Sequence, residues 1–135
     1  MLDAIIKNNK GSIFIETAIS CLVLVIFLTC CVEIFTLITT ELYISKVARE
    51  GGREASLTGS ESVGKAKAQD VANQYLPGKV QPDDIKVYKA VDSTKSHVIC
   101  EVSVDYRYLT LLRSDGIGGR TLNAQAVYPW WDENS

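Results

Sequence analysis

Residues of the types used in catalysis are few in this 135-residue chain, and they are not arranged for it. His97 is the only imidazole, and the sequence places no evident nucleophile beside it. Two of the four cysteines are adjacent to each other, which is not the spacing of a zinc site. We therefore expect no enzyme activity, no metal site, no cofactor and no small-molecule substrate. The net charge of −2 likewise gives no basic face for binding nucleic acid.

The residue that does require a chemical explanation is Glu16, because it lies near the start of an otherwise apolar segment. An ionised carboxylate is costly in a membrane, so such groups usually face a partner or a polar cavity. The positive end of a helix would stabilise this carboxylate, and a nearby ammonium group would do so far more. Glu33, about 25 Å further along a helix, is a second such residue. We favour a position at the outer membrane interface for Glu33, with a contact inside the membrane as the alternative.

The apolar segment that contains Glu16 covers residues 12–40. As a helix it would be about 43 Å long, which exceeds the roughly 30 Å hydrocarbon core of a bilayer. A lone strand cannot satisfy its backbone in lipid, so we expect a transmembrane helix. The alternatives are a buried helix of a soluble protein, a cleaved secretory signal and a lipoprotein signal. Buried runs usually stop at about 10 to 14 residues, and no A-x-A cleavage site follows the segment.

The flanking charges give little information on orientation. Lys7 and Lys10 precede the segment, and Lys46, Arg49 and Arg53 follow it, so the two basic flanks are nearly balanced. A long domain is translocated largely regardless of its charge. We therefore expect a cytoplasmic N-terminus and an extracytoplasmic C-terminal domain.

Two helical stretches are expected after the membrane segment. The first continues to about residue 58, although Gly51 and Gly52 should weaken it, at about 1 kcal/mol each against alanine. Residues 58–60 then indicate a stop and a new N-cap, followed by an amphipathic helix that Pro77 and Gly78 end. Its apolar face is expected to consist of Val63, Ala68, Val71, Ala72, Tyr75 and Leu76.

The remainder predicts three strands, at residues 84–91, 96–112 and 120–130. In the first, Ile85, Val87 and Tyr88 form a nearly alternating pattern. In the second and third, one face is expected to hold Val98, Cys100, Val102, Val104 and Tyr106, and Leu122, Ala124, Ala126 and Tyr128. The fold class is therefore α+β, with a helix packed on a small three-stranded antiparallel sheet. We expect a transmembrane helix with its extension at 12–58 and a head domain at 59–135.

Three further residues of the head domain have open roles. Trp130 and Trp131 follow the last strand, as a partner-binding anchor or as a lid over the end of the sheet. Cys100 is expected to be a half-buried strand residue, and pairing between subunits is left open.

The sequence around Glu16 resembles the N-terminus of a type IV prepilin. The match consists of Lys10-Gly11, then Ser12-Ile13-Phe14-Ile15-Glu16-Thr17-Ala18, then the apolar helix. In that family a membrane prepilin peptidase cuts after a glycine, and the glutamate is the fifth residue of the mature chain. The resemblance implies a leader at residues 1–11 and a cut between Gly11 and Ser12. The cut would create an ammonium group at Ser12, with which Glu16 of the same or a neighbouring subunit could pair.

A second segment, Val47-Ala48-Arg49-Glu50-Gly51-Gly52-Arg53-Glu54-Ala55, resembles TadE-like proteins. These are pseudopilin-like minor components of Tad (tight adherence, Flp-type, type IVb) pilus systems, and they also have a helix followed by a few strands. The chain departs from the family at Thr17, where phenylalanine is common, and lacks the proline often found in the membrane helix. Both a minor component and a main subunit therefore stay open. The resemblance implies subunit-assembly roles for Glu16, Arg49, Glu50 and Arg53.

Taken together, the resemblances imply a structural subunit of an adhesion pilus. The expected location is the bacterial inner membrane as a single-pass protein, with incorporation into a surface pilus. The expected partners are the membrane, prepilin peptidase, other pilin or pseudopilin subunits and the pilus assembly machinery. The alternative is a membrane-tethered binding module that never enters a filament, with Trp130 and Trp131 as its surface.

Overall fold

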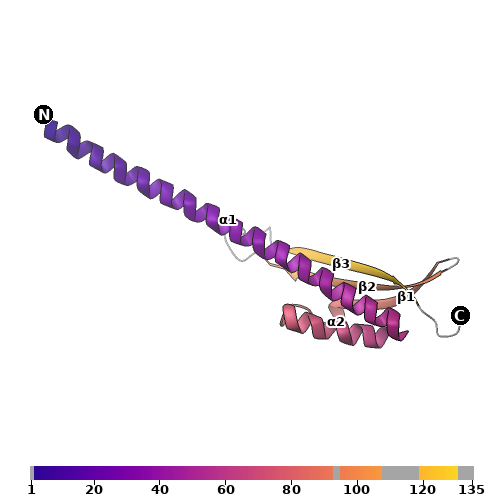
Figure 1. The fold of residues 1–135 in the computed structure, drawn as a ribbon. Coiled ribbons are helices and arrows are strands. Elements are labelled where there is room, and N and C mark those ends of the chain that lie inside the picture. Colours follow the sequence, from indigo (N-terminus) through magenta and orange to yellow (C-terminus); the bar gives the residue numbers. More distant parts are fainter. Residues whose placement is uncertain (1, 93–94, 108–118, 131–135) are drawn as a thin grey trace. The chain divides into compact units, whose positions relative to one another are not determined.

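The computed structural model describes residues 2–92, 95–107 and 119–130, with side chains from Gly11 onward. Its elements, shown in Figure 1, are α1 (Leu2–Thr58), α2 (Glu61–Tyr75), the short 3-10 helix η1 (Pro82–Asp84), β1 (Ile85–Asp92), β2 (Lys95–Tyr106) and β3 (Arg120–Pro129). The predicted α+β class, with a long N-terminal apolar helix, a second helix and a three-stranded antiparallel sheet, is confirmed. The chain forms two compact units, Met1–Phe35 and Thr36–Ser135.

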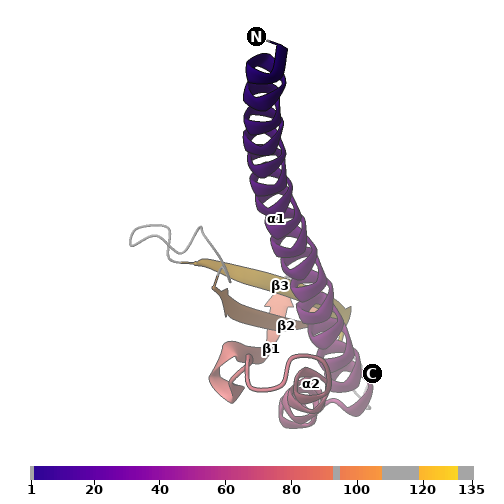
Figure 2. The ribbon, with the colours of Figure 1, turned by 90° about the vertical axis from the view of Figure 1, so that its left-hand side faces the viewer.

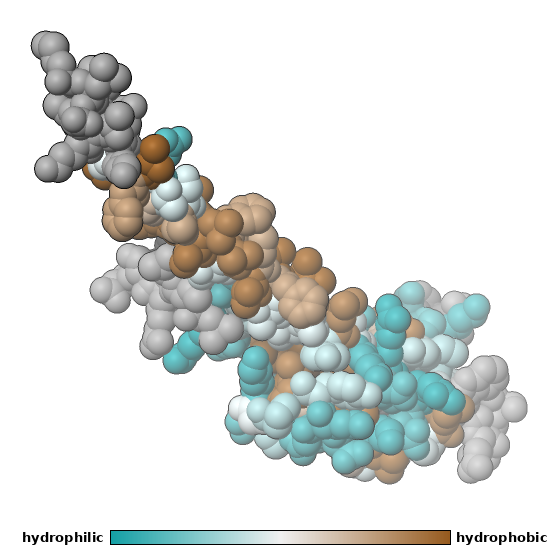
Figure 3. Space-filling model, turned by 60° about the vertical axis from the view of Figure 1, so that its left-hand side comes forward, coloured by the Kyte–Doolittle hydropathy of each residue, from teal (hydrophilic) through white to brown (hydrophobic). Residues whose placement is uncertain are grey.

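The first unit contains the N-terminal part of α1, and from Gly11 onward it exposes a mostly apolar surface, which is visible along the helix in Figure 3. Two of its hydroxyl groups bond within the helix: Thr17 Oγ1 donates to the Ile13 carbonyl and Thr29 Oγ1 to the Val25 carbonyl, both at 2.8 Å. These bonds to the preceding turn give both hydroxyl hydrogens an acceptor on an apolar surface. By length and composition, the stretch from Gly11 is the one described helix able to cross a membrane, which fits a single-pass membrane anchor.

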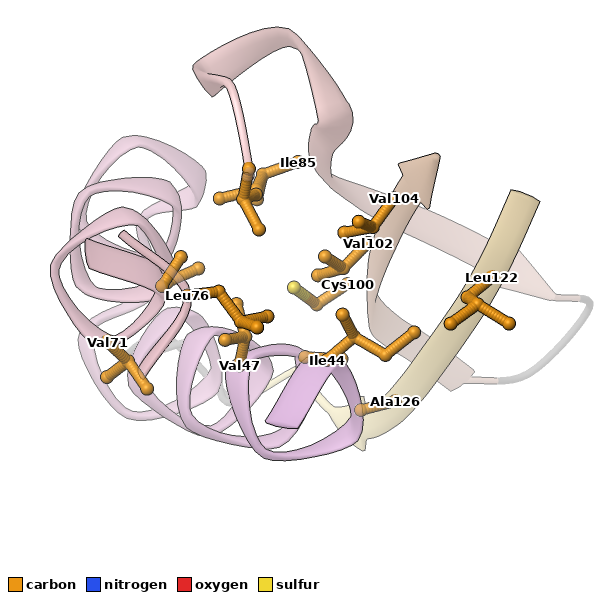
Figure 4. Packing of buried hydrophobic residues seen from close by; sticks show 14 of the residues in the cluster. Ile44, Val47, Val71, Leu76, Ile85, Cys100, Val102, Val104, Leu122 and Ala126 are labelled. Carbon is orange, nitrogen blue, oxygen red and sulfur yellow. The ribbon is translucent and has the colours of Figure 1, made fainter. Parts of the chain in front are cut away.

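The second unit, hereafter the head, contains the end of α1 together with α2 and the sheet. The sheet has the order β1-β2-β3, and both neighbouring pairs are antiparallel. The C-terminal part of α1 lies beside α2, and both helices pack on one face of this sheet (Figures 1 and 2). The core between helices and sheet, part of which appears in Figure 4, contains Ile44, Val47, Ala48, Ala68, Val71, Ala72, Leu76, Val80, Ile85, Cys100, Val102, Val104, Tyr106, Leu122 and Ala126.

The strand faces follow the predicted alternation. The five predicted β2 residues from Val98 to Tyr106 are buried, and on β3 Leu122 and Ala126 are buried while Ala124 and Tyr128 are half-buried. β1 differs in one respect, because Tyr88 lies on the outer face whereas Ile85 and Val87 face the core. β2 starts at Lys95, one residue before the predicted strand, and positions 93–94 and 108–112 lie outside the described residues.

The glycines of α1 have a packing role that the sequence analysis missed. Instead of weakening the helix, Gly51 and Gly52 let it approach two neighbours at once. A Cβ on Gly51 would lie 2.7 Å from the Ala68 Cβ of α2, and a Cβ on Gly52 would lie 3.0 Å from the Tyr128 ring of β3. The helix continues through this pair because the tertiary contact outweighs the unfavourable helix propensity of glycine.

One predicted member of the α2 face is wrong. Val63 is 41% exposed, and the adjacent Gly64 is buried in its place. A Cβ on Gly64 would overlap the Cβ of Ala55 and would lie 2.7 Å from the carbonyl oxygen of Gly51. The close contact between α1 and α2 thus requires glycine at position 64. The larger side chain of Val63 lies on the solvent-exposed side of α2.

We predict that Gly64→Ala destabilises the head by about 1–3 kcal/mol, although alanine is the better helix former. The added methyl group must displace backbone atoms of α1, which a rigid helix resists. Chemical unfolding of the full chain in detergent micelles, followed by tryptophan fluorescence, measures the effect.

Lys67→Ala on the exposed side of α2 is the matched control, and we expect it to change the free energy of unfolding by less than about 0.5 kcal/mol. Equal stability of the two variants would contradict the close packing of α1 on α2.

Candidate functional site

The predicted cleavage site and Glu16 lie together on one side of α1. Gly11, Ser12 and Glu16 are all exposed, and residues four apart are neighbours on a helix surface. A shallow depression on the helix is lined by Gly11, Ser12, Ile15, Glu16, Ile19 and Ser20. Three of these six residues, Gly11, Ser12 and Ser20, have small side chains, so the carboxylate of Glu16 borders an accessible strip of helix.

Glu16 lies in a stretch of the sequence that contains no basic residue. From Gly11 to Phe35 the sequence has no lysine or arginine, so no basic side chain of that stretch can neutralise the carboxylate. Burying an unpaired carboxylate at the centre of a bilayer costs roughly 3 kcal/mol or more. A cation for Glu16 has to come from outside this stretch or from a new amino terminus within it.

The helix is open and locally weakened at Gly11, the predicted cleavage position. A Cβ built on Gly11 would meet nothing within 4 Å, so the helix surface there is free of neighbouring atoms. Glycine lowers helix stability by about 1 kcal/mol against alanine, so the helix opens more easily at this point.

The Val47–Ala55 segment divides into two sides in the structure. Val47, Ala48 and Ala55, with the glycine pair, face α2 and the sheet. Of the residues with implied assembly roles, Arg49 and Arg53 are exposed and Glu50 is half-buried. The apolar half of the segment is thus used inside the head, and the charged half stays available on its surface.

Trp130 is half-buried at the end of the sheet. Its backbone N–H donates to the Ser96 carbonyl at 2.9 Å, and Lys89 Nζ lies 4.7 Å from the centre of its ring. The indole Nε1 is buried without a hydrogen-bond partner among the described residues. This arrangement is that of a side chain covering the sheet end, and Trp131 lies outside the described residues.

His97 is half-buried near the start of β2, opposite Ala90 on β1 and Pro129 on β3. Within the described part of the chain, no three histidine, cysteine or acidic side chains gather so as to hold a metal ion.

A cluster of two tyrosines and a lysine, which the sequence did not predict, lies where α1 meets the C-terminal end of α2. Lys46 Nζ donates to the Tyr75 hydroxyl at 2.6 Å and lies 4.0 Å from the centre of the same ring. The rings of Tyr43 and Tyr75 are 5.3 Å apart. The signal available in the sequence was only the 3-residue spacing of Tyr43 and Lys46, which is common on helices.

Cys100 is fully buried rather than half-buried, beneath the glycine pair of α1. Its Sγ would lie 3.2 Å from a Cβ on Gly51, which shows how closely helix and strand approach. Burial raises the pKa of the Cys100 thiol from 9.0 to about 11, against a smaller lowering by a hydrogen bond with the Gly52 backbone. A thiol in this position cannot form a disulfide with another subunit unless the head opens.

We predict that Cys100 makes the stability of the head depend on pH in the alkaline range. Because the folded head raises the pKa from 9.0 to about 11, it favours the neutral thiol. The contribution is complete below about pH 9 and is lost as the pH rises through 11, by roughly 2–3 kcal/mol. Unfolding titrations at pH 8 to 11 measure this dependence.

Cys100→Ala is the reference chain, since Tyr88 and the lysines titrate in both proteins. The pH dependence should be shallower in the variant. Identical slopes would show that the thiol ionises equally in the folded and unfolded states.

Comparison with known proteins adds no assignment: no family model, curated protein or solved structure matches the chain.

Proposed function

We propose that the chain is a prepilin-type structural subunit, a pseudopilin or minor pilin that contributes to assembly of a Tad-type adhesion pilus. In this proposal prepilin peptidase cuts after Gly11 at the cytoplasmic side of the bacterial inner membrane. The mature chain begins at Ser12, is anchored by α1 and carries the head on the other side. Subunits then enter a filament with the help of the assembly machinery, and the protein is not an enzyme.

The observation that carries the proposal is the placement of Ser12 and Glu16, one helical turn apart on an exposed strip of an apolar helix. Cleavage before Ser12 would convert an amide into an ammonium group at the start of the helix. That group would supply the cation that the sequence from Gly11 to Phe35 does not contain. The same group on a neighbouring subunit could reach Glu16 when two such helices pack together, which would link processing to assembly.

The chemistry of the remaining anchor surface supports a role in helix packing. Large apolar side chains around the strip are exposed on the helix from Ile13 to Phe35. Apolar helices have little hydrophobic reason to associate within lipid, so a polar contact can decide which helices pair. An ammonium–carboxylate pair is the strongest contact that this surface can offer.

The first prediction from this proposal concerns processing. Co-expression with a prepilin peptidase should shorten the chain by the residues Met1 to Gly11, giving an N-terminus at Ser12, as measured by intact mass and N-terminal sequencing. Gly11→Leu should abolish the cut. The space beside Gly11 is open, and the larger leucine side chain would fill it and keep the peptidase from the peptide bond.

Ala66→Leu, at an exposed position of α2 outside the anchor, is the control; its chain should be cut normally. A chain that keeps Met1 in the presence of an active peptidase would contradict the proposal and leave the tethered binding module.

The second prediction concerns assembly. Glu16→Gln should still be inserted and cut, but in a host with the cognate pilus system its incorporation into sheared surface filaments should fall about tenfold or more. The neutral amide keeps the shape of the side chain and removes the charge that pairs with the new amine.

Cys21→Ala, another exposed position on the same helix, is the matched control and should be incorporated like the parent. Normal incorporation of Glu16→Gln would show that the carboxylate has no part in subunit pairing.

A further inference from the structure

The C-terminal part of α1 carries charges in two neighbouring rows on the surface of the head. Arg49 and Arg53 are exposed, and Glu50 and Glu54 are half-buried beside them. Residues four apart lie above one another on a helix, and each following residue is turned by about 100°. The two arginines therefore form a basic row, and the two glutamates form an acidic row next to it. All four residues belong to the head unit.

The surroundings of the two rows show where they lie on the head. Leu42 and Leu57 extend the basic row by seven and by four residues, and they are 65% and 64% exposed. Tyr43, whose ring lies against Tyr75 of α2, extends the acidic row by seven residues. Lys46 lies close to the basic row, but its ammonium group donates to the Tyr75 hydroxyl. The acidic row is thus on the side of α1 nearer α2, and the basic row faces solvent.

This distribution of charge is unfavourable for one helix by itself. Like charges four residues apart repel each other, and both rows are built from such pairs. Among the described residues, none of the four side chains in the two rows forms a hydrogen bond or an ion pair. A local arrangement that lowers the stability of a helix without a gain inside the chain is typical of a surface that meets a partner.

A second copy of the same helix carries the complementary pattern when it runs in the same direction. Seen from outside, the basic row lies on one side of the helix and the acidic row on the other. A copy that faces the first has this order reversed, so each basic row meets an acidic row. Turning that copy end for end restores the order and sets arginine against arginine. The pattern is therefore self-complementary for parallel helices and self-repelling for antiparallel ones.

The spacing within the rows also matches between two parallel copies. With no shift along the helix axis, Arg49 of one copy lies level with Glu50 of the other, and Arg53 with Glu54, each with an offset of about 1.5 Å. A two-fold axis parallel to the helices repeats both contacts on the other side of the seam. One arrangement of two identical chains thus satisfies both rows of both copies.

We propose that the surface of α1 from Leu42 to Leu57 is an interface for a second copy of this chain, whose α1 packs against it in the same direction. The basic row of each copy pairs with the acidic row of the other. The charges select the partner and its direction, and the exposed leucines at the two ends supply apolar contact. The pairing requires no cleavage at Gly11, so it does not rest on the proposed function.

Charge reversal in the full chain tests the pairing. Copies labelled at the C-terminus with a donor or an acceptor dye are mixed in detergent micelles, and energy transfer measures their association over a range of protein concentrations. Arg49→Glu with Arg53→Glu makes both rows acidic, and Glu50→Arg with Glu54→Arg makes both rows basic. Each variant alone should associate about tenfold or more weakly than the parent. An equimolar mixture of the two should associate at least as well as the parent.

Two further chains separate the pairing from general effects of charge and stability. Exchange of the rows by all four substitutions together should restore self-association but not association with the parent, and it keeps the net charge. Lys67→Glu with Lys86→Glu, at two exposed positions outside α1, changes the net charge as much as reversal of the two arginines. This control should associate like the parent. Circular dichroism of every variant checks that the head is folded.

Cross-linking tests the direction of the two helices. Cys21, Cys30 and Cys31 of the anchor are first replaced by alanine, and Leu42→Cys and Leu57→Cys chains are then treated with a short bismaleimide, separately and mixed. Parallel copies should give both products between identical positions. They should give no product between positions 42 and 57, because the 15 residues between these positions correspond to about 22 Å along the helix.

The proposal is overturned if the parent chain stays monomeric at every concentration, if the two oppositely charged variants fail to associate when mixed, or if Leu42→Cys cross-links to Leu57→Cys. Equal association of the parent and both charge-reversed variants also overturns it, because the contact then comes from the anchor alone. Processing at Gly11, measured separately by mass, decides the proposed function and leaves these results unchanged.

Discussion

The head depends on one close contact between its two helices. Gly51 and Ala55 of α1 meet Gly64 and Ala68 of α2 so closely that no larger side chain fits at either glycine. This contact brings α1 near enough to the sheet for Gly52 to touch Tyr128 and for Cys100 to be sealed from water. A small sheet needs a packed apolar face to be stable, and two helices packed this tightly cover most of one face of the sheet. The raised pKa of Cys100 follows from that cover.

The anchor is governed by a different constraint, the cost of charge in lipid. The hydroxyl groups of Thr17 and Thr29 bond to the preceding helical turn, whereas Glu16 lies in a stretch, from Gly11 to Phe35, that has no lysine or arginine to pair with it. A carboxylate of this kind makes the helix dependent on something outside it. In the proposed function the missing cation is produced by cleavage, which gives a chemical reason for processing to precede assembly.

The sequence by itself determined the elements and their faces. The apolar length gave the long helix, the alternation from Val98 to Tyr106 gave the buried face of β2, and Leu122 and Ala126 gave that of β3, because these periods reflect local backbone geometry. The candidate site at Gly11, Ser12 and Glu16 also came from the sequence, since neighbours on a helix are neighbours in the chain. Only the tertiary structure decided the role of the glycines, the exposure of Val63 and the depth of Cys100. These depend on how closely α1, α2 and the sheet approach one another, and a distance between segments far apart in the chain is not contained in any local pattern.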